Sequence, residues 1–222
     1  MKIVSVETLV GCGEFAESKE WADARKVIHS AIRAVENPVG SGKFTIRPAP
    51  KQNGVVPIKT RFQDHLLKTG WVKERPINLS SELQPGNLDF MLSTSYGAPI
   101  AIEWETGNIS SSHRSMNKLA LGLVQGVIRG AVMIVADRSL AKYLTDRIGN
   151  LQELTPYFPF WSSIDCPHGV FEIVAFAHDD EDEALPLIRK GLDGNAKKAR
   201  KKVSQKVKET LVLYARPEKK SN

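Results

Sequence analysis

The stretch that decides the fold spans residues 103–118 and reads Glu-Trp-Glu-Thr-Gly-Asn-Ile-Ser-Ser-Ser-His-Arg-Ser-Met-Asn-Lys. It begins as a strand and continues as a helix whose first turn is polar. Glu103 and Glu105 stand at positions i and i+2 of the strand, so both carboxylates point to one face of the sheet. The stretch therefore joins two neighbouring acids to the polar tip of a helix.

Apolar periodicity predicts helices and strands in alternation along the rest of the chain. Helices are expected over residues 15–36, 57–69, 110–125 and 137–148. Strands are expected over residues 44–46, 87–93, 99–106, 130–136 and 170–177. A short loop joins 87–93 to 99–106, and the two are predicted to form a hairpin. We therefore expect an α/β fold with a mixed central β-sheet flanked by helices, in a single domain over residues 1–222.

The composition is that of a soluble globular protein with a basic balance. Of the 222 residues, 31 are Lys or Arg and 25 are Asp or Glu, which gives a formal charge of +6. This excess favours a polyanionic partner, either nucleic acid or an anionic membrane surface. No stretch approaches the roughly 18 apolar residues of a membrane span, and an early Glu7 argues against a signal peptide. Cys12 and Cys166 form no spaced set, so we expect reduced thiols in a cytoplasmic protein.

Asp89 on the first hairpin strand adds a third acid, because a hairpin can place it beside Glu103 and Glu105. Three crowded carboxylates repel one another and are stable in the ionised form only around a cation. Hard oxygen ligands of this kind suit Mg²⁺ or Mn²⁺. Acids spaced in this way are also common on solvated strand faces, so the spacing alone leaves both interpretations open.

The helix tip offers side chains that can contact nucleic acid. A helix N-terminus favours phosphate groups, Asn108 suits adenine, and Arg114 suits guanine. Ser110 can contact a base or cap the helix. His113 has no His or Cys partner at ligand spacing, so a phosphate contact or a helix-end role is expected rather than metal binding.

Residues 103–123 and three further blocks resemble the BamHI family of type II restriction endonucleases. The further blocks are 53–59, 143–147 with 156–158, and 186–194, in the same order along the chain. The resemblance extends over roughly 45–210 and implies the PD-(D/E)xK nuclease fold. It implies Asp89, Glu103 and Glu105 as catalytic and metal-binding acids, with Glu105 where most of that superfamily has lysine.

The resemblance also implies additional residues of the active site. Glu74 matches a further active-site glutamate, and Lys59 is expected near the scissile phosphate, although a solvated helix lysine is an equal alternative. The expected cofactor is Mg²⁺, for which Mn²⁺ can substitute.

By the same resemblance, five residues read the bases of a GGATCC target: Asn108, Ser110, Arg114, Asp146 and Arg147. Asp146 and Arg147 suit a G·C pair, whereas the residues alone, without the resemblance, favour an exposed ion pair at a helix end. A palindromic target calls for a homodimer. Leu121 and Val124 lie off the main apolar stripe of their helix, so this side is a candidate dimer surface, with burial inside the monomer as an equal alternative.

The basic segment after Asp193 and Gly194 is expected to form an arm over about 193–222 that contacts DNA. A DNA methyltransferase of matching specificity is expected in the same host. Two other functions remain open from the residues alone: a sequence-specific DNA-binding protein without catalysis, and a repair or structure-specific nuclease of the same fold.

Overall fold

The computed structural model describes residues 1–77, 79, 86–145 and 148–190, and a six-stranded sheet runs through this part of the chain in the order β1-β7-β6-β5-β4-β3. The strands are β1 (Lys2–Cys12), β3 (Val72–Pro76), β4 (Asn87–Leu92), β5 (Ile100–Glu105), β6 (Gly130–Ala136) and β7 (Gly169–Ala177). A smaller parallel pair joins β2 (Thr45–Ile46) to β8 (Asp180–Glu181).

The centre of the sheet is parallel and its edges are antiparallel. β5, β6 and β7 run in the same direction, while β1 pairs antiparallel with β7, and β3 and β4 continue antiparallel from β5. Every residue of β5, β6 and β7 is buried, as expected for strands covered on both faces. This confirms the predicted mixed central sheet flanked by helices.

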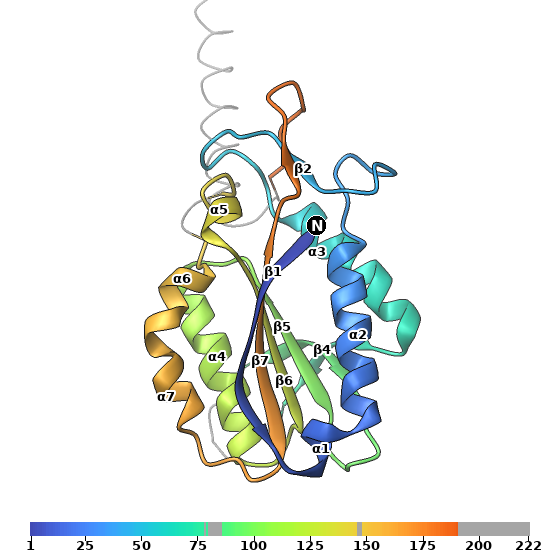
Figure 1. Ribbon diagram of the computed structural model, residues 1–222, viewed down its shortest axis with the longest axis vertical. Coiled ribbons are helices and arrows are strands. Elements are labelled where there is room, and N and C mark those ends of the chain that lie inside the picture. The colour runs from blue at the N-terminus through green and yellow to red at the C-terminus, as the bar shows by residue number, and fades with distance from the viewer. Residues whose placement is uncertain (78, 80–85, 146–147, 191–222) are drawn as a thin grey trace, which may run out of the picture.

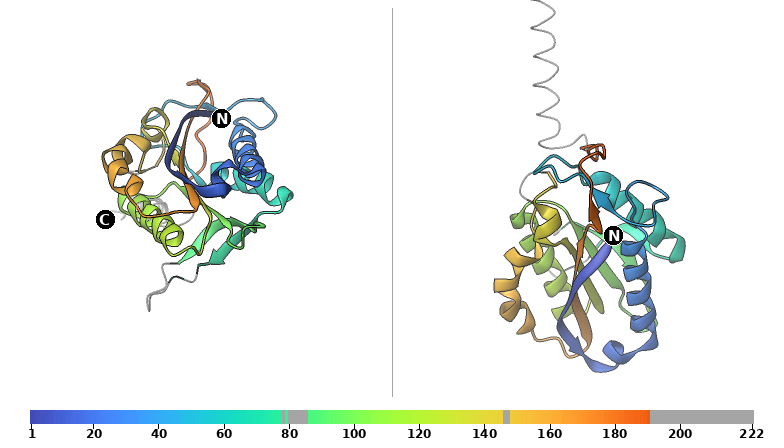
Figure 2. Two further views of the ribbon diagram at one scale, coloured as in Figure 1. Left: turned by 60° about the horizontal axis from the view of Figure 1, so that its bottom comes forward. Right: turned by 45° about the horizontal axis from the view of Figure 1, so that its top comes forward.

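Helices form a layer on each face of the sheet (Figures 1 and 2). One layer contains α2 (Lys19–Arg33) and α3 (Val56–Leu66), with α1 (Gly13–Glu17) at its lower end. The other contains α4 (Ile109–Val124), α6 (Leu151–Leu154) and α7 (Phe158–Ser162). A separate hydrophobic core lies under each layer. No described helix has the length and apolar character needed to cross a bilayer.

The predicted helix over 137–148 is wrong for most of its length, because α5 covers only Arg138–Ala141. The chain leaves the helix where the carbonyl oxygens of Lys142 and Tyr143 accept hydrogen bonds from the backbone N–H groups of Lys51 and Asn53, at 3.0 Å each. The two carbonyl groups thus form hydrogen bonds with the loop at residues 51–53 instead of the hydrogen bonds that would continue the helix. The strand β1 and the helices α6 and α7 were not predicted from the sequence.

Candidate active site

The β4–β5 hairpin brings Asp89 to Glu103. Phe90 pairs with Ile102 in the antiparallel register, and one further step of that register sets Asp89 opposite Glu103. The Asp89 carboxylate accepts a hydrogen bond from the backbone N–H of Trp104 through Oδ2, at 2.9 Å. The first acid of the cluster is thus fixed to the strand that carries the other two.

Lys59, on helix α3, forms an ion pair with the carboxylate of Asp89. Its Nζ lies 2.7 Å from Oδ1 of Asp89, and its side chain is 34% exposed. Pro57 lies within the first two positions of α3, where the missing N–H costs no helical hydrogen bond. The helix therefore places an ammonium group, partly open to solvent, against Asp89.

Glu103 faces α4 and is almost fully buried. Its carboxylate forms an ion pair with Lys118, and both side chains are 8% exposed. Lys118 also donates to the backbone carbonyl of Asn87, with Nζ 2.7 Å from the oxygen. Burial raises the pKa of Glu103 to about 7, with a smaller contribution from the negative charge of Asp89, although Lys118 acts in the opposite direction.

Glu105 lies at the end of β5 and receives two hydrogen bonds. The backbone N–H of Gly107 donates to Oε1, and the Ser115 hydroxyl donates to Oε2 at 3.3 Å. Burial raises the pKa of Glu105 above its ordinary value, and the Asp89 charge contributes in the same direction. A Cβ on residue 107 would lie 2.7 Å from Oε1 of Glu105, so glycine permits this close approach.

The tip of α4 lies directly after these acids. Asn108 caps the helix by accepting a hydrogen bond from the backbone N–H of Ser111 at 3.0 Å, and Ser110 and Arg114 are exposed. The capping role considered for Ser110 thus belongs to Asn108. His113 on α4 packs edge-on against Tyr157, with the ring centroids 4.5 Å apart. Its ring therefore contacts the short helical turn at residues 155–157.

Two further base-reading candidates, Asp146 and Arg147, lie outside the described residues, as do Asp193 and Gly194. The chain beside the first pair is nevertheless placed: Ile148 bridges Asn108, and the Gly149 N–H donates to the carbonyl of Gly107 at 2.9 Å. Residues 148–149 are therefore hydrogen-bonded to the start of α4 and to the turn before it.

Glu74 is less closely associated with the acids. It lies on β3, and the pairs on either side of it set it level with Asp89. Its backbone adopts a positive φ of 53°, and its 66% exposed side chain lies near Lys73, with Oε1 3.4 Å from Nζ. The structure thus places Glu74 on the strand beside Asp89, with its carboxylate paired to Lys73.

Sequence analysis did not identify Ser115 and Lys118, which contact the two glutamates from α4. The sequence did contain an indication, because Lys118 is a charged residue between Met116 and Leu119, on the side of the helix that packs against the sheet. A buried lysine normally requires an anionic partner, which here is Glu103.

The donor chemistry of the cluster fits a hard divalent cation. Asp89, Glu103 and Glu105 supply carboxylate oxygens from two adjoining strands, and such oxygens are the preferred ligands of Mg²⁺ and Mn²⁺. Within the described ranges no three His, Cys, Asp or Glu side chains are already arranged as a formed metal site. In this structure Asp89 is paired with Lys59, Glu103 with Lys118, and Glu105 accepts from the N–H of Gly107.

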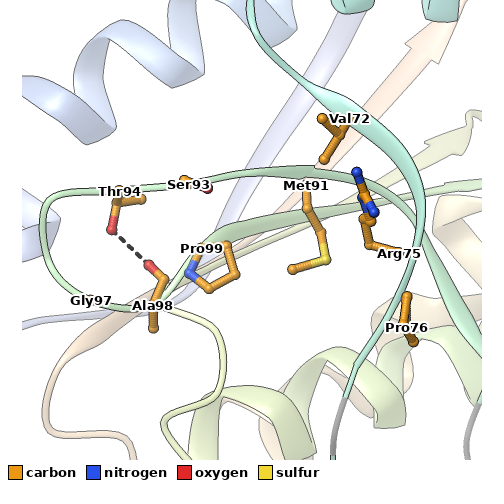
Figure 3. A pocket seen from close by; sticks show the side chains of 9 residues that line it. All are labelled: Val72, Arg75, Pro76, Met91, Ser93, Thr94, Gly97, Ala98 and Pro99. Atoms are coloured by element: carbon orange, nitrogen blue, oxygen red, sulfur yellow. Dashed lines mark hydrogen bonds between the residues drawn. The ribbon is translucent and has the colours of Figure 1, made fainter.

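A cavity of about 500 Å³ lies elsewhere, between β3, β4 and the loop that precedes β5 (Figure 3). Arg75 is the charged residue in its lining, and a hydrogen bond from the Thr94 hydroxyl to the carbonyl of Ala98, 2.6 Å long, closes the loop. It contains none of the three acids, so it is not the candidate site. The remaining lining residues are Val72, Pro76, Met91, Ser93, Gly97 and Pro99.

Comparisons with known proteins match one family over most of the chain. The family described as restriction endonuclease BamHI matches residues 1–195. The chain is 41% identical to the type II restriction enzyme OkrAI of Oceanobacter kriegii over 196 residues, covering 88% of this chain and 99% of that protein. It is 37% identical to the type II restriction enzyme BamHI of Bacillus amyloliquefaciens over 205 residues, covering 86% and 94% respectively.

A solved structure shares the fold at low sequence identity. The restriction endonuclease BglII, crystallised with a DNA 16-mer, is similar with a TM-score of 0.57 and 10% identity, over 83% of this chain and 87% of that one.

Proposed function

The chain belongs to the BamHI family of type II restriction endonucleases, and from this premise we propose that it cuts double-stranded DNA at GGATCC in a Mg²⁺-dependent reaction. The products would carry 5′-phosphate and 3′-hydroxyl ends. The observation that carries the proposal is the position of Asp89, Glu103 and Glu105, which gather immediately before the polar tip of α4.

The three acids have distinct proposed roles. Asp89 and Glu103 would hold the cation, and Glu105 would hold it and help to remove a proton from the attacking water. A bound Mg²⁺ supplies Lewis-acid stabilisation of the negative charge that develops on the phosphate. The partly exposed ammonium group of Lys59 can donate a hydrogen bond to a phosphate oxygen. Glu74, on the strand next to β4, is proposed as an auxiliary acid.

Recognition is proposed to centre on the tip of α4. Exposed Ser110 and Arg114 can reach base edges in the major groove, together with Asn108. Asp146 and Arg147 would add the contacts to a G·C pair from the segment beside this tip. His113 would support the helix end near the backbone of the DNA. The proposed target sequence, GGATCC, rests on the resemblance to BamHI.

The proposed domain covers residues 1–222 and ends in a basic arm over about 193–222, where Asp193 and Gly194 would approach the DNA. The proposal includes a cytoplasmic location and a host methyltransferase that protects the same sequence. Mn²⁺ is expected to replace Mg²⁺, because both accept carboxylate oxygens.

A homodimer is part of the proposal, because each subunit would read one half of a palindrome and cut one strand. On α4, Leu121 is 40% exposed and Val124 is 49% exposed. Burial of these two side chains inside the monomer, the alternative considered from the sequence, does not occur. Sedimentation at micromolar concentration, with and without DNA, would test the dimer, and a monomer under both conditions would contradict it.

The proposed function is tested with a plasmid that carries a single GGATCC site. Incubation with Mg²⁺ should give one linear product, EDTA should prevent cleavage, and sequencing of the ends should place both cuts within the site. Binding without cleavage would instead support a DNA-binding protein. Cutting at another hexamer would contradict the proposed sequence, and cutting governed by DNA shape would favour a repair nuclease.

A further inference from the structure

Two lysines engage the acid cluster in different ways. Lys59 approaches Asp89 from the surface, and both of these side chains are partly exposed, at 34% and 23%. Lys118 approaches Glu103 from α4, and both side chains of this pair are 8% exposed. Because solvent screens the first pair much more than the second, the charge of Lys118 acts on the cluster at closer to full strength.

Lys118 is also held in place by a second contact. Its Nζ donates to the backbone carbonyl of Asn87, 2.7 Å away, at the start of the strand that carries Asp89. The ammonium group thus spans Glu103 on β5 and the backbone of β4. If a cation takes the Glu103 carboxylate, Lys118 still has the carbonyl of Asn87 as an acceptor.

A divalent cation and an ammonium group compete for the same carboxylate oxygen. Both are attracted by the negative charge, and they repel each other when they are a few ångströms apart. We propose that Lys118 is a resident counter-ion that occupies Glu103 in the absence of a bound cation and competes with the divalent cation for this carboxylate. This inference rests on the proposed function, because it takes Glu103 as a metal ligand.

The competition has a consequence for the resting protein. When all three acids are ionised, Asp89, Glu103 and Glu105 carry three negative charges, and Lys59 and Lys118 return two positive charges to the same region. The resting cluster is therefore close to balanced, so it can stay folded without a metal. The same balance weakens its attraction for a free cation.

The test measures Mn²⁺ binding to the full chain without DNA, by electron paramagnetic resonance titration of free Mn²⁺. Lys118→Met removes the ammonium group and keeps a side chain of similar length. We expect Mn²⁺ to bind about tenfold more tightly to this variant than to the wild type, because one buried positive charge beside the site has been removed. Lys118→Gln, which retains a donor for the carbonyl of Asn87, should show the same direction and serves if the apolar replacement does not fold.

A matched control separates the local charge from the net charge of the protein. Lys26 lies on α2, on the opposite face of the sheet, and its side chain is 80% exposed. Lys26→Met makes the same change in total charge and should leave Mn²⁺ affinity unchanged. In a Glu103→Gln background, Lys118→Met should tighten Mn²⁺ binding much less, because competition for the shared carboxylate is gone and only the repulsion between the two cations remains.

Unchanged or weaker Mn²⁺ binding in the Lys118 variants would overturn the inference. Weaker binding would mean that Lys118 positions Glu103 for the cation instead of competing with it. Plasmid cleavage by the wild type, measured in parallel, distinguishes the two proposals. If the wild type cleaves but the Lys118 variants do not gain affinity, only the counter-ion role fails; if the wild type neither binds Mn²⁺ nor cleaves, the proposed function fails.

Discussion

Two buried glutamates lie on opposite faces of the same sheet. Glu103 on β5 faces α4, and Glu172 on β7 faces α2; they are 6% and 2% exposed. Each is paired with a cation from the covering helix, Lys118 in one case and Arg25 in the other. Burial raises the pKa of both carboxyl groups.

Their surroundings differ. Glu172 accepts from Arg25 Nε at 3.0 Å and from the Thr8 hydroxyl at 3.3 Å, with no second acid among the causes of its pKa shift. The negative charge of Asp89 instead contributes to the raised pKa of Glu103. Glu103 also lies on the same strand as Glu105, two residues before it, and α4 begins shortly after that strand. Burial and ion pairing therefore occur both at Glu172 and at Glu103 of the candidate site. The feature that distinguishes Glu103 is the presence of other acidic residues nearby.

The largest expected effect comes from removing an acid of the cluster. Glu105→Ala should reduce DNA cleavage in Mg²⁺ by at least about a thousandfold, because both a metal ligand and the proposed proton acceptor are lost. Specific DNA binding should remain largely intact, because the tip of α4 is unchanged. Cleavage assays and gel-shift titrations without metal measure the two properties separately.

Glu172→Gln is the matched control on the other face of the sheet. It removes an equally buried negative charge and keeps an acceptor for Arg25, so cleavage should proceed at the wild-type rate. Full cleavage by Glu105→Ala would remove Glu105 from the mechanism. A loss of cleavage in Glu172→Gln with an intact fold would show that the contrast between the two faces is mistaken.

A smaller effect is expected from the cation partners. Lys59→Met removes the ammonium group next to Asp89 and should slow cleavage about tenfold to a hundredfold, the range expected for one charge-assisted contact. Single-turnover cleavage under saturating enzyme measures this change. Arg25→Met is the matched control, because it removes the cation that pairs with Glu172 on the other face of the sheet, and it should leave the cleavage rate unaltered. Equal effects of the two substitutions would indicate that Lys59 acts only through folding.

Much of the fold could be predicted because its central elements have strong local patterns. β5, β6 and β7 are almost continuously apolar, and α4 has a clear apolar side. β1 could not be found in this way, since it mixes polar and apolar residues and its partner β7 lies more than 150 residues later. Pairing between distant segments leaves no mark on the local sequence.

The segment after β6 shows a different limit. Leu140, Tyr143, Leu144 and Ile148 were expected on one helical face, and all four are buried, yet only Leu140 lies in a helix. The apolar positions predicted burial correctly, while tertiary hydrogen bonds from the loop at residues 51–53 decided the backbone conformation. Apolar spacing therefore indicates which side chains face the core more reliably than it indicates the backbone that carries them.

The candidate site was predictable to the extent that its acids lie close in sequence. Spacing indicated Glu103 and Glu105, and the hairpin added Asp89. Lys118 was missed because its contact depends on how α4 crosses the sheet, which the helical pattern does not specify. The positions of Asp146, Arg147, Asp193 and Gly194 stay predictions.

The smallest expected effect concerns stability and pH on the face away from the site. The pKa of Glu172 is raised in the folded protein, so the folded state holds its proton more tightly than the unfolded state does. Its contribution to the free energy of unfolding is therefore fully present below the ordinary carboxyl pKa and is lost as the pH rises through the raised value. Glu172→Gln removes this loss, so the variant should gain stability relative to the wild type as the pH rises above the ordinary carboxyl pKa. Denaturant unfolding of the wild type and the variant at each pH measures the difference. A stability difference that stays constant with pH would mean that Arg25 compensates fully for the burial of Glu172, and the two glutamates would then differ in ionisation as well as in their neighbours.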